Sequence, residues 1–151
     1  MRIALFGMIA FVAGCSNFPP ASGDAPIDEG WQPANGAIIP PIDTAPNVSI
    51  LERNGSDVVV QITNLGTSSL EYGEKNETSI LRCREIERNG KWLFDTCDTC
   101  GMGIISRELL PGQSIKVLLR FELPEKRERL LGSFYQTGTD KHSYVVLAFE
   151  P

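Results

Sequence analysis

Residues 115–122 read Ile-Lys-Val-Leu-Leu-Arg-Phe-Glu, and this stretch decides the fold class. Its apolar side chains stand at every second position, namely Ile115, Val117, Leu119 and Phe121. Successive side chains of a strand point to opposite faces of a sheet, so this period of two predicts a strand with one buried face. The turn signal Pro111-Gly112 separates it from the apolar run 104–110.

A second alternating stretch lies earlier in the chain, where Val58, Val60 and Ile62 share one face of residues 57–63. Asn54-Gly55 precedes it, and this dipeptide is the strongest short signal for a tight β-hairpin. We therefore expect residues 48–53 to pair with residues 57–63.

Two more hairpins complete the pattern. Residues 79–87 and 91–96 flank Arg88-Asn89-Gly90, and residues 128–136 and 142–150 flank a polar linker. Seven or eight short strands at this spacing, without a helical pattern, predict an all-β protein that folds as a single β-sandwich.

The composition fits one folded domain with appendages. The chain has 151 residues, of which 42% are hydrophobic and 22% are charged, as is typical of globular proteins. Its formal net charge of −5 makes nucleic acid a poor partner. The single histidine, His142, has no catalytic motif around it, so we expect no enzyme activity, no cofactor and no metal.

The amino terminus has the pattern of an export signal. Arg2 is followed by the uncharged apolar run 3–12, which ends at small residues before Cys15. A membrane-spanning helix needs about 20 apolar residues, and this run is shorter. We therefore expect residues 1–14 to be a cleaved signal peptide.

The tetrapeptide Val12-Ala13-Gly14-Cys15 resembles the lipobox of bacterial lipoproteins. The resemblance implies that Cys15 is joined to a diacylglycerol by a thioether bond and then becomes the new amino terminus. It also implies a place in the bacterial cell envelope, and Ser16 after the cysteine favours the outer membrane where the cell has one. The alternative is an ordinary cleaved signal peptide in which Cys15 is incidental.

A proline-rich, acidic stretch follows the cysteine. Residues 16–46 hold seven of the ten prolines, four acidic residues and no Lys or Arg. Such a composition cannot bury a core, so we expect residues 15–46 to form an extended tether spanning about 30 Å root-mean-square. We interpret the apolar run 38–42 as the lead-in to the first strand rather than a partner-docking motif. The sandwich domain is expected over residues 47–151.

Residues 58–64, 110–117, 132–135 and 144–149 together resemble the strands of an immunoglobulin-like or fibronectin type III-like sandwich of bacterial surface proteins. The resemblance implies an architecture without an activity, because such folds host many functions. The antibody pattern of a tryptophan between two inter-sheet cysteines is not present in its usual spacing.

Cys83, Cys97 and Cys100 remain once Cys15 is assigned to the lipid, which is an odd number for an exported domain. Counting outward from a two-residue turn at Asn89-Gly90 places Cys83 within one residue of Cys97, and a bulge would bring the two together. We therefore expect a disulfide from Cys83, to either Cys97 or Cys100.

Two other uses of these cysteines remain open. Cys97 and Cys100 could form a redox dithiol for disulfide exchange, although no helix begins there to stabilise a thiolate. Alternatively, Cys83, Cys97 and Cys100 could hold a metal with His142 or Asp98 as the fourth ligand, although a single C-x2-C knuckle is a weak signal.

The remaining polar groups are interpreted as surface residues. His142 stands at the start of the last strand, where we expect an exposed side chain. Strand alternation places two carboxylate pairs, Glu71 with Glu74 and Glu85 with Glu87, on solvated faces.

The sequence thus favours a non-catalytic binding or structural module, anchored to the membrane through the lipid on Cys15 and meeting a protein partner in the envelope. An envelope thiol protein that uses Cys97 and Cys100 for disulfide exchange or metal capture is the alternative. A protease-inhibitor-like sandwich is a second alternative, because some bacterial inhibitors share this architecture.

Overall fold

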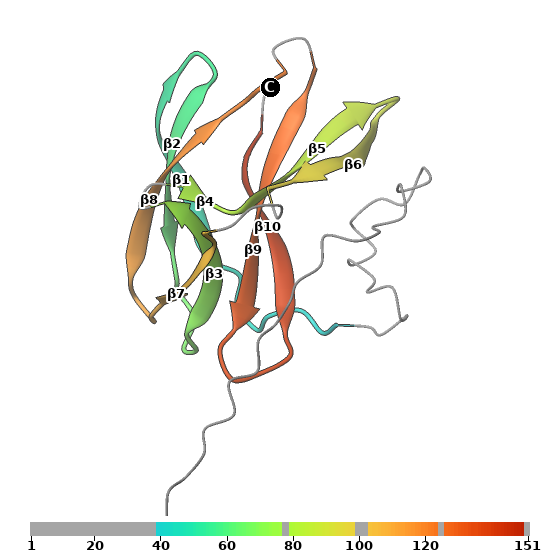
Figure 1. Cartoon of the computed structure of the whole chain (residues 1–151). Coiled ribbons are helices and arrows are strands. Elements are labelled where there is room, and N and C mark those ends of the chain that lie inside the picture. The colour runs from blue at the N-terminus through green and yellow to red at the C-terminus, as the bar shows by residue number, and fades with distance from the viewer. Residues whose placement is uncertain (1–38, 77–78, 99–102, 124–125, 150–151) are drawn as a thin grey trace, which may run out of the picture.

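The computed structural model describes residues 39–76, 79–98, 103–123 and 126–149. These ranges contain ten strands and no helix, and two antiparallel sheets pack together as a sandwich (Figure 1). The strands are β1 (Asn47–Asn54), β2 (Asp57–Thr63), β3 (Leu70–Asn76), β4 (Ser79–Ile80), β5 (Arg82–Arg88), β6 (Lys91–Cys97), β7 (Ile105–Leu109), β8 (Ser114–Arg120), β9 (Glu128–Gln136) and β10 (His142–Phe149). The predicted all-β sandwich is confirmed, with ten strands rather than seven or eight. Cys15, Cys100 and most of the expected tether lie outside the described residues.

The smaller sheet contains β1, β2 and β8 in that order. The Asn54-Gly55 hairpin joins β1 to β2 as predicted, and Gly55 has the positive φ of 58° that favours glycine in such a turn. Val58, Val60 and Ile62 are fully buried, which confirms the alternation predicted for this strand. The strand predicted from residues 115–121 is β8, which pairs with β2 along its whole length.

The larger sheet is organised around β9. β10 pairs along one edge of β9. The other edge is divided, because residues 70–72 of β3 pair with residues 134–136, and residues 82–86 of β5 pair with residues 128–132. β3 and β5 therefore lie end to end beside the same strand. Figure 1 shows the consequence, in which β5 and β6 leave the sandwich as a separate hairpin.

Leu81 marks the point where the chain changes partner. β4 pairs with β3, whereas β5 pairs with β9. Between them the N–H of Leu81 donates to the carbonyl of Gly73 at 2.8 Å. The prediction of one continuous strand over residues 79–87 is therefore wrong, because two short strands with different partners meet at Leu81.

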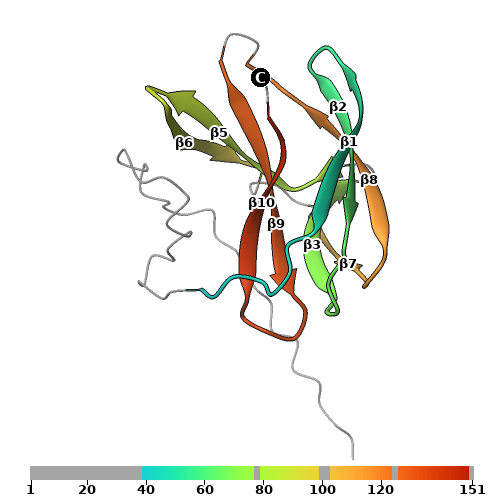
Figure 2. The same cartoon turned by 180° about the vertical axis from the view of Figure 1, so that it is seen from behind.

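Residues 40–43 bind to the end of the β9–β10 hairpin, and we call this segment the latch. Ile42 is buried in the core, and its N–H donates to Ser143 Oγ at 3.2 Å. The N–H of Asp43 donates to Gln136 Oε1 at 3.0 Å, and Gln136 Nε2 returns a 2.8 Å hydrogen bond to the Asp43 carboxylate. Figure 2 shows the chain crossing beside β9 and β10 before it enters β1. The packed part of the chain thus begins before residue 47, and the apolar run is a lead-in.

The change of partner at Leu81 predicts an unusual sensitivity at Gly73. A Cβ added to Gly73 would lie 2.9 Å from Leu81 Cγ and 3.3 Å from Leu81 Cβ, both closer than ordinary contact. We expect Gly73→Ala to lower the free energy of unfolding by about 1–3 kcal/mol, as overpacking does. Urea denaturation followed by circular dichroism measures the loss.

The matched control is the same substitution in a Leu81→Ala background. Removing the larger side chain relieves the clash, so Gly73→Ala should cost less there than in the parent chain. Equal costs in the two backgrounds would show that the contact with Leu81 does not constrain this position.

Candidate functional site

The feature that separates this molecule from a plain sandwich is the projecting β5–β6 hairpin, residues 82–98, which we call the wing. Its inner strand, β5, pairs with β9 and with β6. Among the strands of the described ranges, β6 pairs only with β5. It is therefore an edge strand of the larger sheet, and its outer side has no strand partner among these residues. Asn89 and Gly90 form the tip of the wing with positive φ angles of 54° and 75°.

A disulfide closes the base of the wing. Cys83 stands opposite Cys97, and the two are joined. The register shifts between Arg84 and Glu85, so that Asp95 is an extra residue in β6. Counting from the turn placed Cys83 one residue away from Cys97, and this bulge supplies the extra residue that brings the two opposite each other. The expected bridge from Cys83 is confirmed, with Cys97 as its partner.

The pairing bears on the other uses considered for the cysteines. Because the sulfur of Cys97 is bonded to Cys83, it is not half of a Cys97–Cys100 dithiol in this state. Asp98, considered as a fourth metal ligand, forms an ion pair with Arg82 at 3.2 Å instead. In the part of the chain that the structure describes, no three Cys, His, Asp or Glu residues are grouped to hold a metal.

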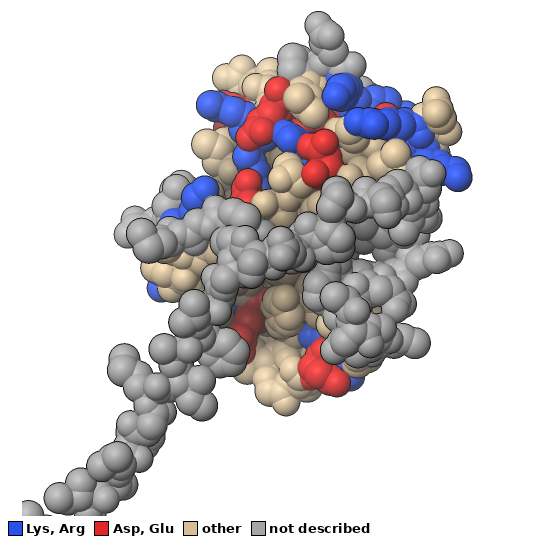
Figure 3. All heavy atoms as spheres, turned by 45° about the vertical axis from the view of Figure 1, so that its right-hand side comes forward, with Lys and Arg blue, Asp and Glu red and all other residues tan. Residues whose placement is uncertain are grey.

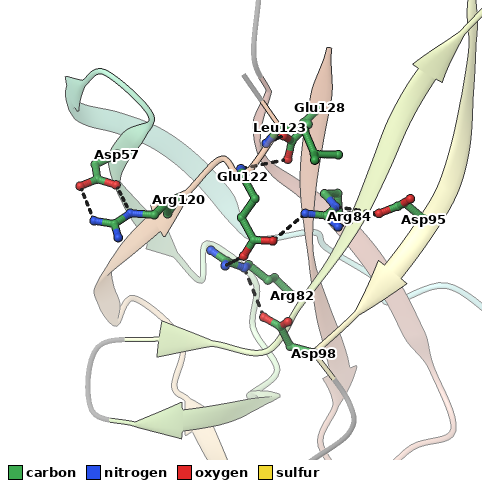
Figure 4. Close-up of polar contacts among 9 residues, drawn as sticks. All are labelled: Asp57, Arg82, Arg84, Asp95, Asp98, Arg120, Glu122, Leu123 and Glu128. Atoms are coloured by element: carbon green, nitrogen blue, oxygen red, sulfur yellow. Dashed lines mark hydrogen bonds and ion pairs between the residues drawn. The ribbon is translucent and has the colours of Figure 1, made fainter. Parts of the chain in front are cut away.

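The inner face of the wing meets the end of β8 through a cluster of ion pairs (Figure 4). Glu122 bridges the guanidinium groups of Arg82 and Arg84 at 3.3 and 2.7 Å, and Arg84 also contacts Asp95 at 2.7 Å. Burial opposes the charge on Arg84, yet its hydrogen bonds to Asp95 and Glu122 raise its pKa above the usual value. The cavity here has a volume of about 20 Å³, enough for about one water. The cluster therefore joins the wing to the sandwich and leaves no room for a ligand.

Glu128 fixes the position of Glu122 within this cluster. Its side chain is fully buried, and its carboxylate accepts hydrogen bonds from the backbone N–H groups of Glu122 and Leu123. Figure 4 shows this carboxylate beside Leu123 and the backbone of Glu122. Buried carboxylates are tolerated when they are paired in this way.

The outer face of the wing carries aromatic rings covered by arginines. Cross-strand pairing places Glu87 opposite Trp92 and Glu85 opposite Phe94. The guanidinium carbons of Arg129 and Arg127 lie 4.9 and 5.8 Å from the centroid of the Trp92 ring, within cation–π range. The same arginines form ion pairs with Glu85 and Glu87.

These contacts correct the expectation that the paired carboxylates are solvated. Glu85 is fully buried, and its neighbour Glu87 is partly covered. In β3, the side chain of Glu74 is 13% exposed and forms an ion pair with Arg107 at 2.5 Å. The prediction of solvated faces is therefore wrong for these carboxylates, because strand alternation could not show that arginines from β7 and from the start of β9 cover them.

Three cations near the tip of the wing have no acidic partner among the described residues: Arg88, Lys91 and Lys126. All three are exposed. Figure 3 shows Lys and Arg side chains at the upper end of the molecule together with Asp and Glu side chains, in a chain whose formal net charge is −5. Phe94 is 42% exposed in the same hairpin. The wing, residues 82–98, holds four basic and four acidic residues, so its formal charges balance. It therefore combines an outer strand edge, an exposed aromatic ring and two cations, Arg88 and Lys91, that form no ion pair with a described residue.

His142 lies at the opposite end of the larger sheet. The prediction of an exposed histidine is wrong, because its side chain is buried between Tyr135 and Tyr144, with ring centroids 4.4 and 4.7 Å away. Its Nε2 is 2.8 Å from Ser133 Oγ, and its backbone N–H donates to the carbonyl of Pro40 at 2.9 Å. Burial lowers the pKa of His142. The residue thus packs the hairpin end to which the latch binds.

A groove of about 250 Å³ lies at the seam between the sheets. Its walls come from β3, β4 and β8: Tyr72, Glu74, Ser79, Ile80, Ile115, Lys116 and Val117. This volume falls below the roughly 300–1,000 Å³ of typical small-molecule pockets. We therefore take the wing, rather than this groove, as the candidate site.

Comparison with protein-family models, with curated proteins and with solved structures found no match to this chain. Among the described residues, no helix has the length and apolar character needed to cross a membrane.

The bridge at the base of the wing predicts a specific peptide map. Trypsin leaves Cys97 and Cys100 on one peptide, so a second digestion with endoproteinase Asp-N, which cuts before Asp98, separates them. Mass spectrometry under non-reducing conditions should find Cys83 linked to the fragment that ends at Cys97. A link from Cys83 to the Cys100 fragment would contradict the register.

Replacing Cys83 and Cys97 by alanine should lower the free energy of unfolding by about 3 kcal/mol, since the closed loop is about 15 residues long.

The buried histidine predicts a loss of stability in mild acid. Because burial lowers the pKa of His142 below 6.5, the imidazole binds a proton more readily in the unfolded chain than in the folded domain. The free energy of unfolding should therefore fall as the pH decreases through about 6.5. Urea denaturation between about pH 8 and about pH 5 measures this slope, and His142→Gln should flatten it. Asp43 has a lowered pKa through its hydrogen bonds to Lys141 and Gln136, so its effect belongs to more acidic conditions. An unchanged slope in the variant would contradict the assignment.

Proposed function

We propose that this chain is a non-catalytic, lipid-anchored protein of the bacterial envelope that holds its sandwich domain away from the membrane for binding to a partner. The proposal joins the lipobox-like sequence Val12-Ala13-Gly14-Cys15 to the proline-rich stretch that follows it. Multiple acyl chains would make attachment effectively permanent, because each buried methylene contributes about 0.8 kcal/mol. Ser16 favours the outer membrane where the cell has one. The proposed fold family is the immunoglobulin-like sandwich of bacterial surface proteins.

The observation that carries the proposal is the placement of the latch. Residues 40–43 bind where β9 ends, at Gln136, whereas the wing pairs with the start of β9, at Glu128. β9 is nine residues long from Glu128 to Gln136, so its two ends lie roughly 25–30 Å apart along an extended strand. Figure 1 shows the wing and the β9–β10 turn at opposite ends of the molecule.

This geometry would control how the domain is presented. A tether that joins the domain at the latch leads from the membrane to the end distant from the wing. The wing would then point away from the lipid, toward the space in which a partner is met. The several hydrogen bonds of the latch keep this exit point fixed relative to the sheet.

The anchoring step is tested by metabolic labelling with a palmitate analogue in a bacterium that expresses the full chain. The parent chain should be labelled and should fractionate with membranes, and Cys15→Ala should lose both properties. Cys100→Ala is the matched control, since it removes a cysteine outside the proposed lipobox and should keep the label. Absence of label from the parent chain, together with recovery in the soluble fraction, would contradict the proposal.

A further inference from the structure

We propose that β6 is a docking edge for an extended, acidic segment of a protein partner, which adds to the wing as a further strand. This inference deepens the proposed function by naming the surface and the kind of partner that an envelope-anchored binding module would use. It stands on three features of the wing: its outer edge, its local charge and its aromatic face.

The edge provides the main-chain contacts. In the described part of the chain, β6 has a strand partner on one side only. Its other side is without a strand partner over the full seven residues of the strand. Every second N–H and carbonyl of such a strand points outward and can hydrogen-bond to an added strand. The Cys83–Cys97 disulfide and the contacts of Arg84 with Asp95 hold this edge in place before a partner arrives. A fixed edge lowers the entropic cost of binding.

The charge selects the partner. Arg88, Lys91 and Lys126 are exposed and form no ion pair with a described acidic residue, although the whole chain is acidic. A neutral or basic peptide would leave these cations unpaired, whereas a carboxylate beside Lys91 would pair with it. Complementary charge of this kind raises the association rate and excludes wrong partners.

The aromatic face sets the pattern of the partner's side chains. Trp92 and Phe94 point to one face of β6, and Lys91 and Leu93 point to the other. Arg127 and Arg129 hold the Trp92 ring, and Phe94 remains 42% exposed beside the edge. An added strand would therefore place apolar side chains over Phe94 and carboxylates on the face of Lys91. The expected ligand alternates apolar and acidic residues.

The test uses the purified full chain and a synthetic seven-residue peptide of alternating Glu and Val, matched to the length of β6. Fluorescence anisotropy measures the affinity at low salt. The peptide should bind, and binding should weaken as salt is added. A peptide of alternating Lys and Val should not bind, and neither should a Glu-Val peptide whose backbone N–H groups are methylated. Equal binding of the methylated peptide would show that charge alone attracts it and would overturn strand addition.

Variants of the chain separate the wing from the rest of the surface. Combining Arg88→Glu with Lys91→Glu should weaken binding by about tenfold or more. Lys116→Glu reverses one charge on β8, outside the wing, and should leave the affinity unchanged, whereas Lys91→Glu alone reverses one charge within the wing and should weaken binding. Circular dichroism and the thermal midpoint of each variant show that it is folded. Equal weakening by Lys91→Glu and Lys116→Glu would locate the binding elsewhere and overturn the proposal.

Two further measurements address other occupants of the edge. Binding to phosphatidylglycerol vesicles that is lost in the wing variant, without binding of the Glu-Val peptide, would assign the wing to a membrane surface and overturn the proposal. Dimerisation in light scattering that the wing variant abolishes would assign the edge to a second copy of the chain and would also overturn it. All these measurements work without a lipid on Cys15, so a failure of anchoring and a failure of strand addition give different results.

Discussion

The division of one edge of β9 between β3 and β5 is the constraint on which the rest of the structure depends. β3 occupies that edge only at residues 70–72, and the chain then passes through β4 and Leu81 before β5 takes the remaining length. Because β5 begins a new pairing there, it can diverge from the smaller sheet and carry β6 with it. A continuous strand in this position would have kept β6 within the sandwich. The wing and its outer edge are therefore consequences of sheet topology.

Such a divergence opens a space between the wing and β8, and charged residues fill it. Glu122 of this cluster is 55% exposed, and the Arg84 side chain is 16% exposed, so the ion pairs sit at the boundary between core and solvent. Partly exposed pairs contribute little to the free energy of unfolding, but several that share one carboxylate restrict the angle between two elements. Buried Glu128 holds the backbone of Glu122, and the disulfide holds the base of β6. Covalent and ionic contacts thus replace apolar packing where the core ends.

The sequence-based predictions succeeded where the deciding contacts are local. The alternation in residues 57–63 and 115–121 reports burial directly, and the turn at Asn89-Gly90 set the count that brought Cys83 to Cys97. They failed where the partner lies far along the chain. β3 is absent from the predictions because Leu-Glu-Tyr-Gly-Glu-Lys-Asn offers two apolar residues among charges, and its pairing with β9 and β7 decides its state. The burial of Glu85 and His142 likewise depends on Arg129 and on Tyr135, which alternation alone cannot place. The predictions also gave no sign of an outer β6 edge, because that property depends on the order of all the strands.

Together, the latch at one end of β9 and the wing at the other define a domain with a side for attachment and a side for recognition. Native-state amide hydrogen exchange of the purified full chain, measured by NMR, tests this account most directly. Alternate amides along β6, those directed toward β5, should be protected, and the amides between them should exchange nearly as fast as in an unstructured peptide. Uniform protection along β6 would contradict the account, because it would mean that another part of the chain already occupies the outer edge.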